Sequence, residues 1–196
     1  MFVKICGITS AAAADAAAEA GADAVGFVLA PSPRQVTVAQ ARELGARLPR
    51  GVLRVAVLRR PEADLVARVL DELEPDWLQA DAEDFAAIRL PAGCTALPVY
   101  RTGRAPGADE APGRLLFESP WSGSGRLADW DEARALAEGR ELILAGGLDA
   151  ANVEAAIRAV RPWGVDVSTG VERAPGEKDP DKIKAFVACA RRAGRE

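Results

Sequence analysis

Short apolar runs rich in β-branched residues recur along the whole chain and are separated by more polar stretches. Each run has the length of a buried strand, and most are followed by a stretch with helical character. Strands that alternate with helices pair in parallel through right-handed crossovers, which indicates the α/β class. Eight such runs are present: Phe2 to Cys6, Ala24 to Leu29, Leu53 to Leu58, Trp77 to Gln79, Ala96 to Tyr100, Leu115 to Glu118, Leu142 to Ala145 and Val165 to Val167.

The stretches between these runs carry the spacing and end signals of helices. In the segment Glu62 to Leu73, the apolar positions repeat with the period of a helix. The fifth unit differs, because residues 102–113 are rich in Gly and Pro; its helix is expected to be short or missing. The remaining predicted helices are Ala11 to Ala20, Val38 to Leu48, Asp149 to Val160 and Asp179 to Ala193, with Asp129 starting the helix after strand six.

Two architectures accommodate this alternation: an open, doubly wound sheet and a closed (β/α)8 barrel. An open sheet is expected to carry a glycine-rich dinucleotide fingerprint after its first strand, and the stretch CGITSA is not one. The length of 196 residues lies near the lower limit for a barrel. We therefore expect a compact (β/α)8 TIM barrel in a single domain over residues 1–196.

Composition narrows the class of protein. Apolar residues make up 49% and charged residues 28%, as in ordinary globular proteins. No apolar run is long enough to span a bilayer and no signal peptide is evident, so we expect no membrane partner. The net charge of −4 and the lack of basic runs disfavour nucleic acid. Three cysteines without metal-ligand spacing are typical of reduced thiols, which predicts a cytoplasmic location.

The chain contains no histidine. This excludes Ser-His-Asp and Cys-His nucleophile systems and histidine-based zinc sites, and we expect no metal. Any proton transfer near neutral pH must then use Cys, Asp, Glu, Lys or Tyr, with pKa values tuned by their surroundings.

Cys6 is the first candidate for such chemistry. It ends the first predicted strand and is followed by Gly7, with Thr9 or Ser10 as the expected cap of the next helix. A thiol between a strand end and a helix start lies where α/β proteins place their active sites. The alternative interpretation is a buried cysteine that only fills the core.

The last two strand ends carry signals of phosphate binding. In barrels these two loops often bind phosphate through backbone N–H groups and a helix N-terminus. After strand seven, Gly146 and Gly147 lack a Cβ and let a ligand approach the backbone closely. The stretch after strand eight offers hydroxyls and exposed amides at Ser168, Thr169 and Gly170. A phosphorylated small molecule is therefore the expected ligand class.

Lys4 is an unusual residue for a core strand. Strand alternation places it on the same side as Cys6, one layer deeper, where an unpaired ammonium group is costly. Strand eight, the neighbour of strand one in a closed barrel, offers Asp166 on the same side as Ser168. We therefore expect Asp166 to pair with Lys4 within the site, and the Lys4 cation to favour the Cys6 thiolate.

Several stretches together resemble the phosphoribosylanthranilate isomerase family of tryptophan biosynthesis. The resemblance runs from Val3 to Asp179 in the family's order, over VKICGIT, ADAVGFVLAPSPRQV, GSGRLADW, LILAGGLDAANV and GVDVSTGVERAPGEKD. It implies a (β/α)8 barrel without a cofactor. It also implies an Amadori rearrangement of N-(5-phosphoribosyl)anthranilate to 1-(2-carboxyphenylamino)-1-deoxyribulose 5-phosphate.

The resemblance also implies roles for individual residues. In the family, the cysteine of the KICG motif removes a proton from the sugar C2 atom, which assigns the base to Cys6. An aspartate at the end of strand six protonates the furanose ring oxygen, and Glu118 takes that position here. The family's arginine after strand two corresponds to Arg34, whose planar guanidinium group suits the anthranilate carboxylate.

Two departures from the family pattern leave a second interpretation open. Glu118 is one methylene longer than the family's aspartate, and LQADAED, from Leu78 to Asp84, replaces a motif close to VQLHGDE. A degenerate barrel that binds a phosphorylated ligand with little turnover is therefore the alternative to an active isomerase. Metal-dependent sugar phosphate epimerases, which use His ligands, are disfavoured. A monomer and a homodimer are both compatible with the sequence.

Overall fold

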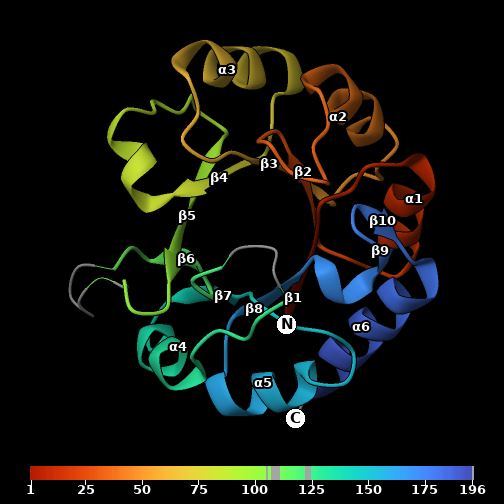
Figure 1. Ribbon diagram of the computed structural model, residues 1–196, viewed down its shortest axis with the longest axis vertical. Helices are drawn as coiled ribbons and strands as arrows, with labels where there is room; N and C mark the ends of the chain where they lie inside the picture. Colours follow the sequence, from red (N-terminus) through yellow and green to blue (C-terminus); the bar gives the residue numbers. More distant parts are fainter. Residues whose placement is uncertain (105, 107–110, 122–124, 196) are drawn as a thin grey trace.

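Eight parallel strands close into a barrel in which each strand pairs with its neighbours in sequence and β1 pairs with β8. The computed structural model describes residues 1–104, 106, 111–121 and 125–195. The expected compact TIM barrel is confirmed, and Figure 1 shows the helices as a ring around the strands. The strands are β1 (Phe2–Cys6), β2 (Ala24–Val28), β3 (Leu53–Val57), β4 (Trp77–Asp81), β5 (Thr95–Arg101), β6 (Arg114–Glu118), β7 (Glu141–Leu144) and β8 (Gly164–Val167).

Two of the strands extend further than their apolar runs. β4 ends at Asp81 rather than at Gln79, and β5 ends at Arg101 rather than at Tyr100. Apolar patterning misses such positions because it stops where a polar or charged residue interrupts it, as at Gln79 in β4 and Arg101 in β5, whereas the parallel backbone ladder continues. As a result, two charged side chains are held by strands at the barrel mouth.

The helices follow the strands with two exceptions. The helical segments are α1 (Ala11–Glu19), α2 (Val38–Gly45), α3 (Ala63–Arg68), which continues as the π-helical turn η1 (Val69–Leu73), α4 (Trp130–Ala137), α5 (Val153–Val160) and α6 (Pro180–Ala193). The fourth unit has only the 3₁₀ turn η2 (Ala82–Ala86). In the fifth unit, residues 105 and 107–110 lie outside the described residues, and the described part of 102–113 forms no helix.

Helix starts are set by side-chain caps. Ser10 accepts a hydrogen bond from the Ala13 amide at α1, and Asp129 accepts from the first-turn amides of α4, as expected for its position. Thr37 forms a reciprocal capping box with Gln40 at α2. Such caps satisfy N–H groups that have no partner inside the helix.

The loop after β8 contains elements that were not expected. It forms the 3₁₀ turn η3 (Thr169–Val171), followed by an antiparallel hairpin of β9 (Glu172–Ala174) and β10 (Glu177–Lys178). The hairpin lies beside α1 and leads into α6 (Figure 1). It brings residues distant in sequence next to the loop after β2.

The amino-terminal end of the barrel is closed by aromatic side chains. Phe2 stacks on Trp163 and on Trp77, with ring centroids 4.5 Å and 5.2 Å apart. The Arg114 guanidinium group lies 4.5 Å from the Trp77 ring centroid. Trp77 and Trp163 are thus packing residues. Among the described residues, no helix is long and apolar enough to cross a membrane.

Candidate active site

The carboxyl ends of the strands surround a cavity of about 650 Å³. Ligands of parallel α/β barrels bind at this end, because the loops after the strands meet there. Both proposed proton-transfer groups line the cavity, Cys6 from β1 and Glu118 from β6. The other titratable or charged lining residues are Arg34, Arg59, Asp81, Arg101, Asp166, Glu172 and Arg173.

Below the cavity, Lys4 and Asp166 form the expected ion pair. Lys4 Nζ lies 2.8 Å from Asp166 Oδ1, and the two residues are register partners across β1 and β8. The Lys4 side chain is fully buried. A buried ammonium group requires such a partner, so this part of the sequence prediction is confirmed.

Two opposing effects act on the Cys6 thiol, which is 7% exposed. Burial raises the pKa of Cys6 because it disfavours the thiolate, while the Lys4 and Lys178 cations lower it. The net pKa lies above its ordinary value. Lys4 therefore favours the thiolate as expected, but it does not outweigh burial in the protein without a ligand.

Gly26 makes room for the thiol. It is the register partner of Cys6 across β1 and β2. A Cβ at position 26 would lie 2.9 Å from Cys6 Sγ and 3.2 Å from Lys4 Nζ. Gly26 is not among the predicted site residues, although it lies within the quoted stretch ADAVGFVLAPSPRQV and a glycine inside an apolar strand is a known signal of close approach.

Glu118 shares its site with two residues that the sequence analysis did not assign. Arg101 Nη2 lies 3.0 Å from Glu118 Oε1 and 2.6 Å from Asp81 Oδ1. Burial alone lowers the pKa of Arg101, but the two carboxylates more than offset this and raise it. The guanidinium group therefore stays charged between them.

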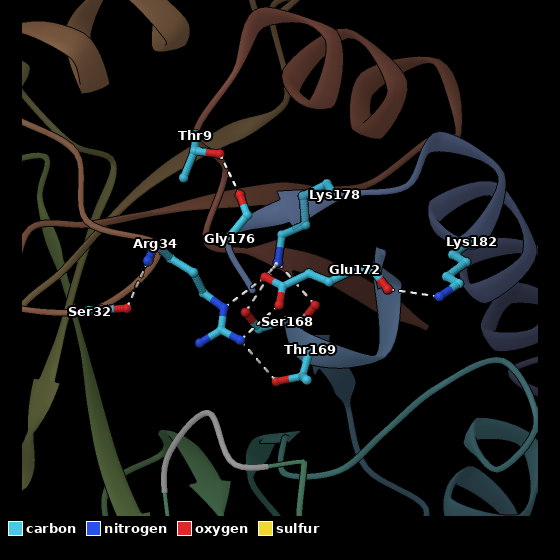
Figure 2. A network of polar contacts seen from close by, with 9 residues as sticks. All are labelled: Thr9, Ser32, Arg34, Ser168, Thr169, Glu172, Gly176, Lys178 and Lys182. Carbon is cyan, nitrogen blue, oxygen red and sulfur yellow. Dashed lines mark hydrogen bonds and ion pairs between the residues drawn. The ribbon is translucent and has the colours of Figure 1, made fainter. Parts of the chain in front are cut away.

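Arg34 belongs to a network of charged side chains from the loops after β2 and β8 (Figure 2). Its Nε donates to Glu172 Oε1 at 2.7 Å, and its Nη2 donates to Glu172 Oε2 at 2.8 Å and to Thr169 Oγ1 at 3.2 Å. Lys178 Nζ donates to Glu172 Oε1 at 2.8 Å and to the Ser168 carbonyl at 3.0 Å. The guanidinium group is thus held on one edge by a two-pronged carboxylate contact.

This network also shifts pKa values. Burial alone raises the pKa of Glu172, but hydrogen bonds from Arg34 and Lys178 outweigh it and lower the pKa. The same bond to Glu172 raises the pKa of Arg34. Burial lowers the pKa of Lys178. Glu172 and Lys178 lie within the quoted GVERAPGEKD motif, but no spacing rule predicts that the hairpin folds them back onto Arg34.

A smaller pocket of about 50 Å³ lies between the loops after β6, β7 and β8. Gly146 and Gly147 have φ values of +89° and +67°, and a Cβ on Gly147 would lie 2.7 Å from the Arg126 carbonyl carbon. A Cβ on Gly170 would lie 2.0 Å from the Leu148 carbonyl oxygen. The glycines are thus required for close packing of these loops. The pocket is lined by Gly146, Gly147, Asp166, Ser168, Thr169 and Gly170, together with Glu118, Ser119, Trp121 and Arg126.

The structure therefore brings all the sequence-predicted site residues to one end of the barrel. Gln79 also lines the cavity, and its buried Oε1 atom accepts no hydrogen bond from any described residue. The described ranges contain no cluster of three or more His, Cys, Asp or Glu residues that could hold a metal ion.

Comparison with known proteins agrees with this geometry. The family model described as N-(5'phosphoribosyl)anthranilate (PRA) isomerase matches residues 3–189. A curated relative from Bordetella petrii, N-(5'-phosphoribosyl)anthranilate isomerase, is 44% identical over 211 residues, covering 97% of this chain and 95% of the relative.

The chain belongs to the phosphoribosylanthranilate isomerase family. The family and the isomerase activity of tryptophan biosynthesis expected from the motifs are thereby confirmed. The solved phosphoribosylanthranilate isomerase from Thermus thermophilus superposes with a TM-score of 0.85 at 33% identity, covering 98% of this chain and 99% of that one. Another isomerase was solved in complex with reduced 1-(o-carboxyphenylamino)-1-deoxyribulose 5-phosphate; it has a TM-score of 0.79 at 34% identity, covering 97% and 98% of the two chains.

Proposed function

We propose that Cys6 and Glu118 carry the two proton transfers by which this isomerase rearranges N-(5-phosphoribosyl)anthranilate. The observation that supports this most is that a thiol and a carboxyl from different strands line one cavity in a chain without histidine. This rearrangement needs one group that donates a proton and one that removes a proton, each within reach of the substrate. No other cysteine lines this cavity among the described residues.

The reaction starts with the protonated Glu118 carboxyl. It donates its proton to the furanose ring oxygen, the bond between this oxygen and C1 of the sugar breaks, and an iminium ion forms. The Cys6 thiolate then removes the proton from C2, and the electron pair neutralises the iminium nitrogen. The resulting enolamine tautomerises to the product ketone. Lys4 stabilises the thiolate that this step needs.

Arg34 and the small pocket bind the two anionic ends of the substrate. Glu172 holds the Nε and Nη2 edge of Arg34, and no described residue hydrogen-bonds to its Nη1. That nitrogen is directed away from Glu172 (Figure 2) and binds the anthranilate carboxylate. The phosphate occupies the pocket between Gly146, Gly147 and residues 168–170, where Ser168 and Thr169 supply hydroxyl groups. The relative solved with a reduced product analogue supports a phosphorylated ligand of this class.

The same proposal includes the domain organisation, the cellular location and the partner of the enzyme. Residues 1–196 act as one catalytic domain in the cytoplasm, where the three free cysteines Cys6, Cys94 and Cys189 stay reduced. Its partner is the small phosphorylated substrate. Sedimentation analysis distinguishes a monomer from a homodimer.

Steady-state turnover of freshly prepared phosphoribosylanthranilate, followed by the loss of its fluorescence, tests the assignment. Cys6→Ser and Glu118→Gln should each lower kcat by ~10²- to 10⁴-fold, the usual contribution of an acid or base. Cys189→Ser on α6 is the control and should retain full turnover. Turnover that survives Glu118→Gln would show that another group is the acid. Negligible wild-type turnover with tight binding of a product analogue would favour the degenerate barrel instead.

A further inference from the structure

Arg101 contacts a residue from each of the two places where the sequence departs from the family pattern. Glu118 and Asp81, the last residue of β4, both form ion pairs with the Nη2 atom of Arg101, at 3.0 Å and 2.6 Å. The side chains of Asp81, Glu118 and Arg101 are 8%, 13% and 19% exposed. Three charged side chains of this low exposure at the mouth of a cavity are costly unless they compensate one another.

The strand register explains why the three groups converge. Arg101 and Glu118 are direct partners across β5 and β6, and Asp81 is the partner of Val99, two residues before Arg101. Residues two apart in a strand lie on the same side, so all three side chains are directed into the same cavity as Cys6. The group is therefore held by strands rather than by loops, which makes its geometry rigid.

The cluster of Asp81, Arg101 and Glu118 contains two acidic side chains and one basic side chain. One guanidinium group faces two carboxylates, and without it these two groups would lie close together as like charges. Asp81 binds Arg101 more closely than Glu118 does. Arg101 is thus anchored on Asp81, and a second contact reaches the longer Glu118 side chain. A glutamate has one more rotatable bond than an aspartate and needs such a contact to keep its carboxyl in one place.

We propose that Arg101, anchored on Asp81, is a positioning residue that fixes the Glu118 carboxyl at the barrel mouth for proton donation. The inference rests on the role proposed above for Glu118. Arg101 itself favours the ionised form of Glu118, and Asp81 limits this effect because it shares the guanidinium charge. The other charged or titratable residues lining the pockets with Glu118 are Cys6, Arg34, Arg59, Arg126, Asp166 and Glu172, with Arg173 at the rim.

A kinetic comparison of arginine variants tests the positioning role. Arg101→Met should lower kcat by about 10- to 100-fold, because a misplacement of ~1 Å can cost that much, while KM changes little because the carboxylate and phosphate sites remain. Arg101→Lys keeps the charge and should recover part of the loss. Arg68→Met, an exposed arginine on α3, is the control and should leave both constants unchanged. An Arg101→Met enzyme with wild-type kcat would overturn the proposal.

A direct titration separates this role from a merely structural one. Carbon-13 NMR of labelled glutamate, with the Glu118 signal assigned by its loss in Glu118→Gln, reports the ionisation of this carboxyl. Arg101→Met should move its titration to higher pH and Asp81→Asn to lower pH, since the first removes a nearby cation and the second removes a nearby anion that competes for it. Unchanged titrations, or shifts in the same direction, would contradict the proposal.

Three further outcomes keep the interpretations apart. If Arg101→Met fails to fold because two carboxylates are left facing each other, the double variant Arg101→Met/Asp81→Asn removes both charges and should still show the loss of kcat. If Glu118→Gln retains turnover, the role proposed for Glu118 fails. If Glu118→Gln is inactive while the Arg101 variants are fully active, the positioning role of Arg101 alone fails.

Discussion

Burial and the nearby cations have opposite effects on the pKa of the Cys6 thiol. Burial raises its pKa, and so does the nearby Asp166, whereas Lys4 and Lys178 lower it. A thiol with a raised pKa is a stronger base once ionised but is ionised less often near neutral pH. The fraction of Cys6 present as thiolate should therefore increase as the pH rises toward the pKa of Cys6, and the neighbouring charges decide how far the pH must rise.

Replacing Lys4 or Asp166 should move the Cys6 titration in opposite directions. Lys4→Met removes a cation that lowers the pKa of Cys6, so the thiol should titrate at higher pH and turnover at neutral pH should fall. Asp166→Asn removes an anion that raises this pKa, so titration should occur at lower pH. The ultraviolet absorbance of the thiolate, in a background with Cys94 and Cys189 replaced by serine, measures both shifts.

Each variant also leaves one member of the buried pair without its partner, so its folding is checked first by circular dichroism. If neither change altered the titration or turnover, Lys4 would have only a structural role.

At the scale of the element, the β9–β10 hairpin holds the arginine proposed to bind substrate. It places Glu172 against Arg34 and Lys178 against Glu172, and its turn packs on the loop after β2. Gly176 in this turn has φ of +82°, and a Cβ there would lie 2.4 Å from the Pro33 carbonyl oxygen. The Thr9 hydroxyl donates to the Gly176 carbonyl at 2.8 Å, which ties the turn to the loop after β1.

Gly176→Ala should therefore displace the hairpin from Arg34 and weaken substrate binding. We expect KM for phosphoribosylanthranilate to rise by about 10-fold or more, the order of effect of losing one charged contact. The matched control is Gly139→Ala, between α4 and β7, where φ is +71° but a Cβ meets no atom within 4 Å. It introduces similar backbone strain and should leave KM unchanged. An equal rise in both variants would show that strain, not the hairpin contact, controls binding.

At the scale of the whole molecule, the two ends of the barrel have different tasks. The carboxyl end carries the charged groups and the cavity, while the amino end is closed by Phe2, Trp77 and Trp163 with Arg114 against the rings. Side chains that fill the amino end of a TIM barrel contribute to stability, because the chemistry lies at the opposite end. Stability and catalysis should therefore respond to separate sets of substitutions.

Trp163→Ala tests this separation. Loss of a stacked indole ring should lower the free energy of unfolding by about 3 kcal/mol, as is typical of a large aromatic residue replaced by alanine. Thermal unfolding measures this change, and kcat/KM measured below the transition should remain close to that of the wild type. A large loss of kcat/KM at a temperature where the variant is folded would show that the two ends are coupled.

Local patterns in the sequence determined the barrel. Apolar runs and helical periods report on burial and backbone conformation within a few residues, and these suffice to order eight strands and their connections. They also placed Cys6, Glu118, Gly146 and residues 168–170 at strand ends, where parallel strands converge. The pairing of Lys4 with Asp166 was predictable for the same reason, since closure makes β1 and β8 neighbours and a buried charge needs a partner.

Only the tertiary structure decided which charges hold the functional groups. Asp81, Arg101 and Glu118 come from three strands, and the hairpin brings Glu172 and Arg34 together over 138 positions of sequence. No periodicity encodes such contacts, because they depend on register, side-chain reach and the path of one loop. The raised pKa of Cys6 likewise follows from burial by the whole barrel, a property that no single stretch of sequence carries.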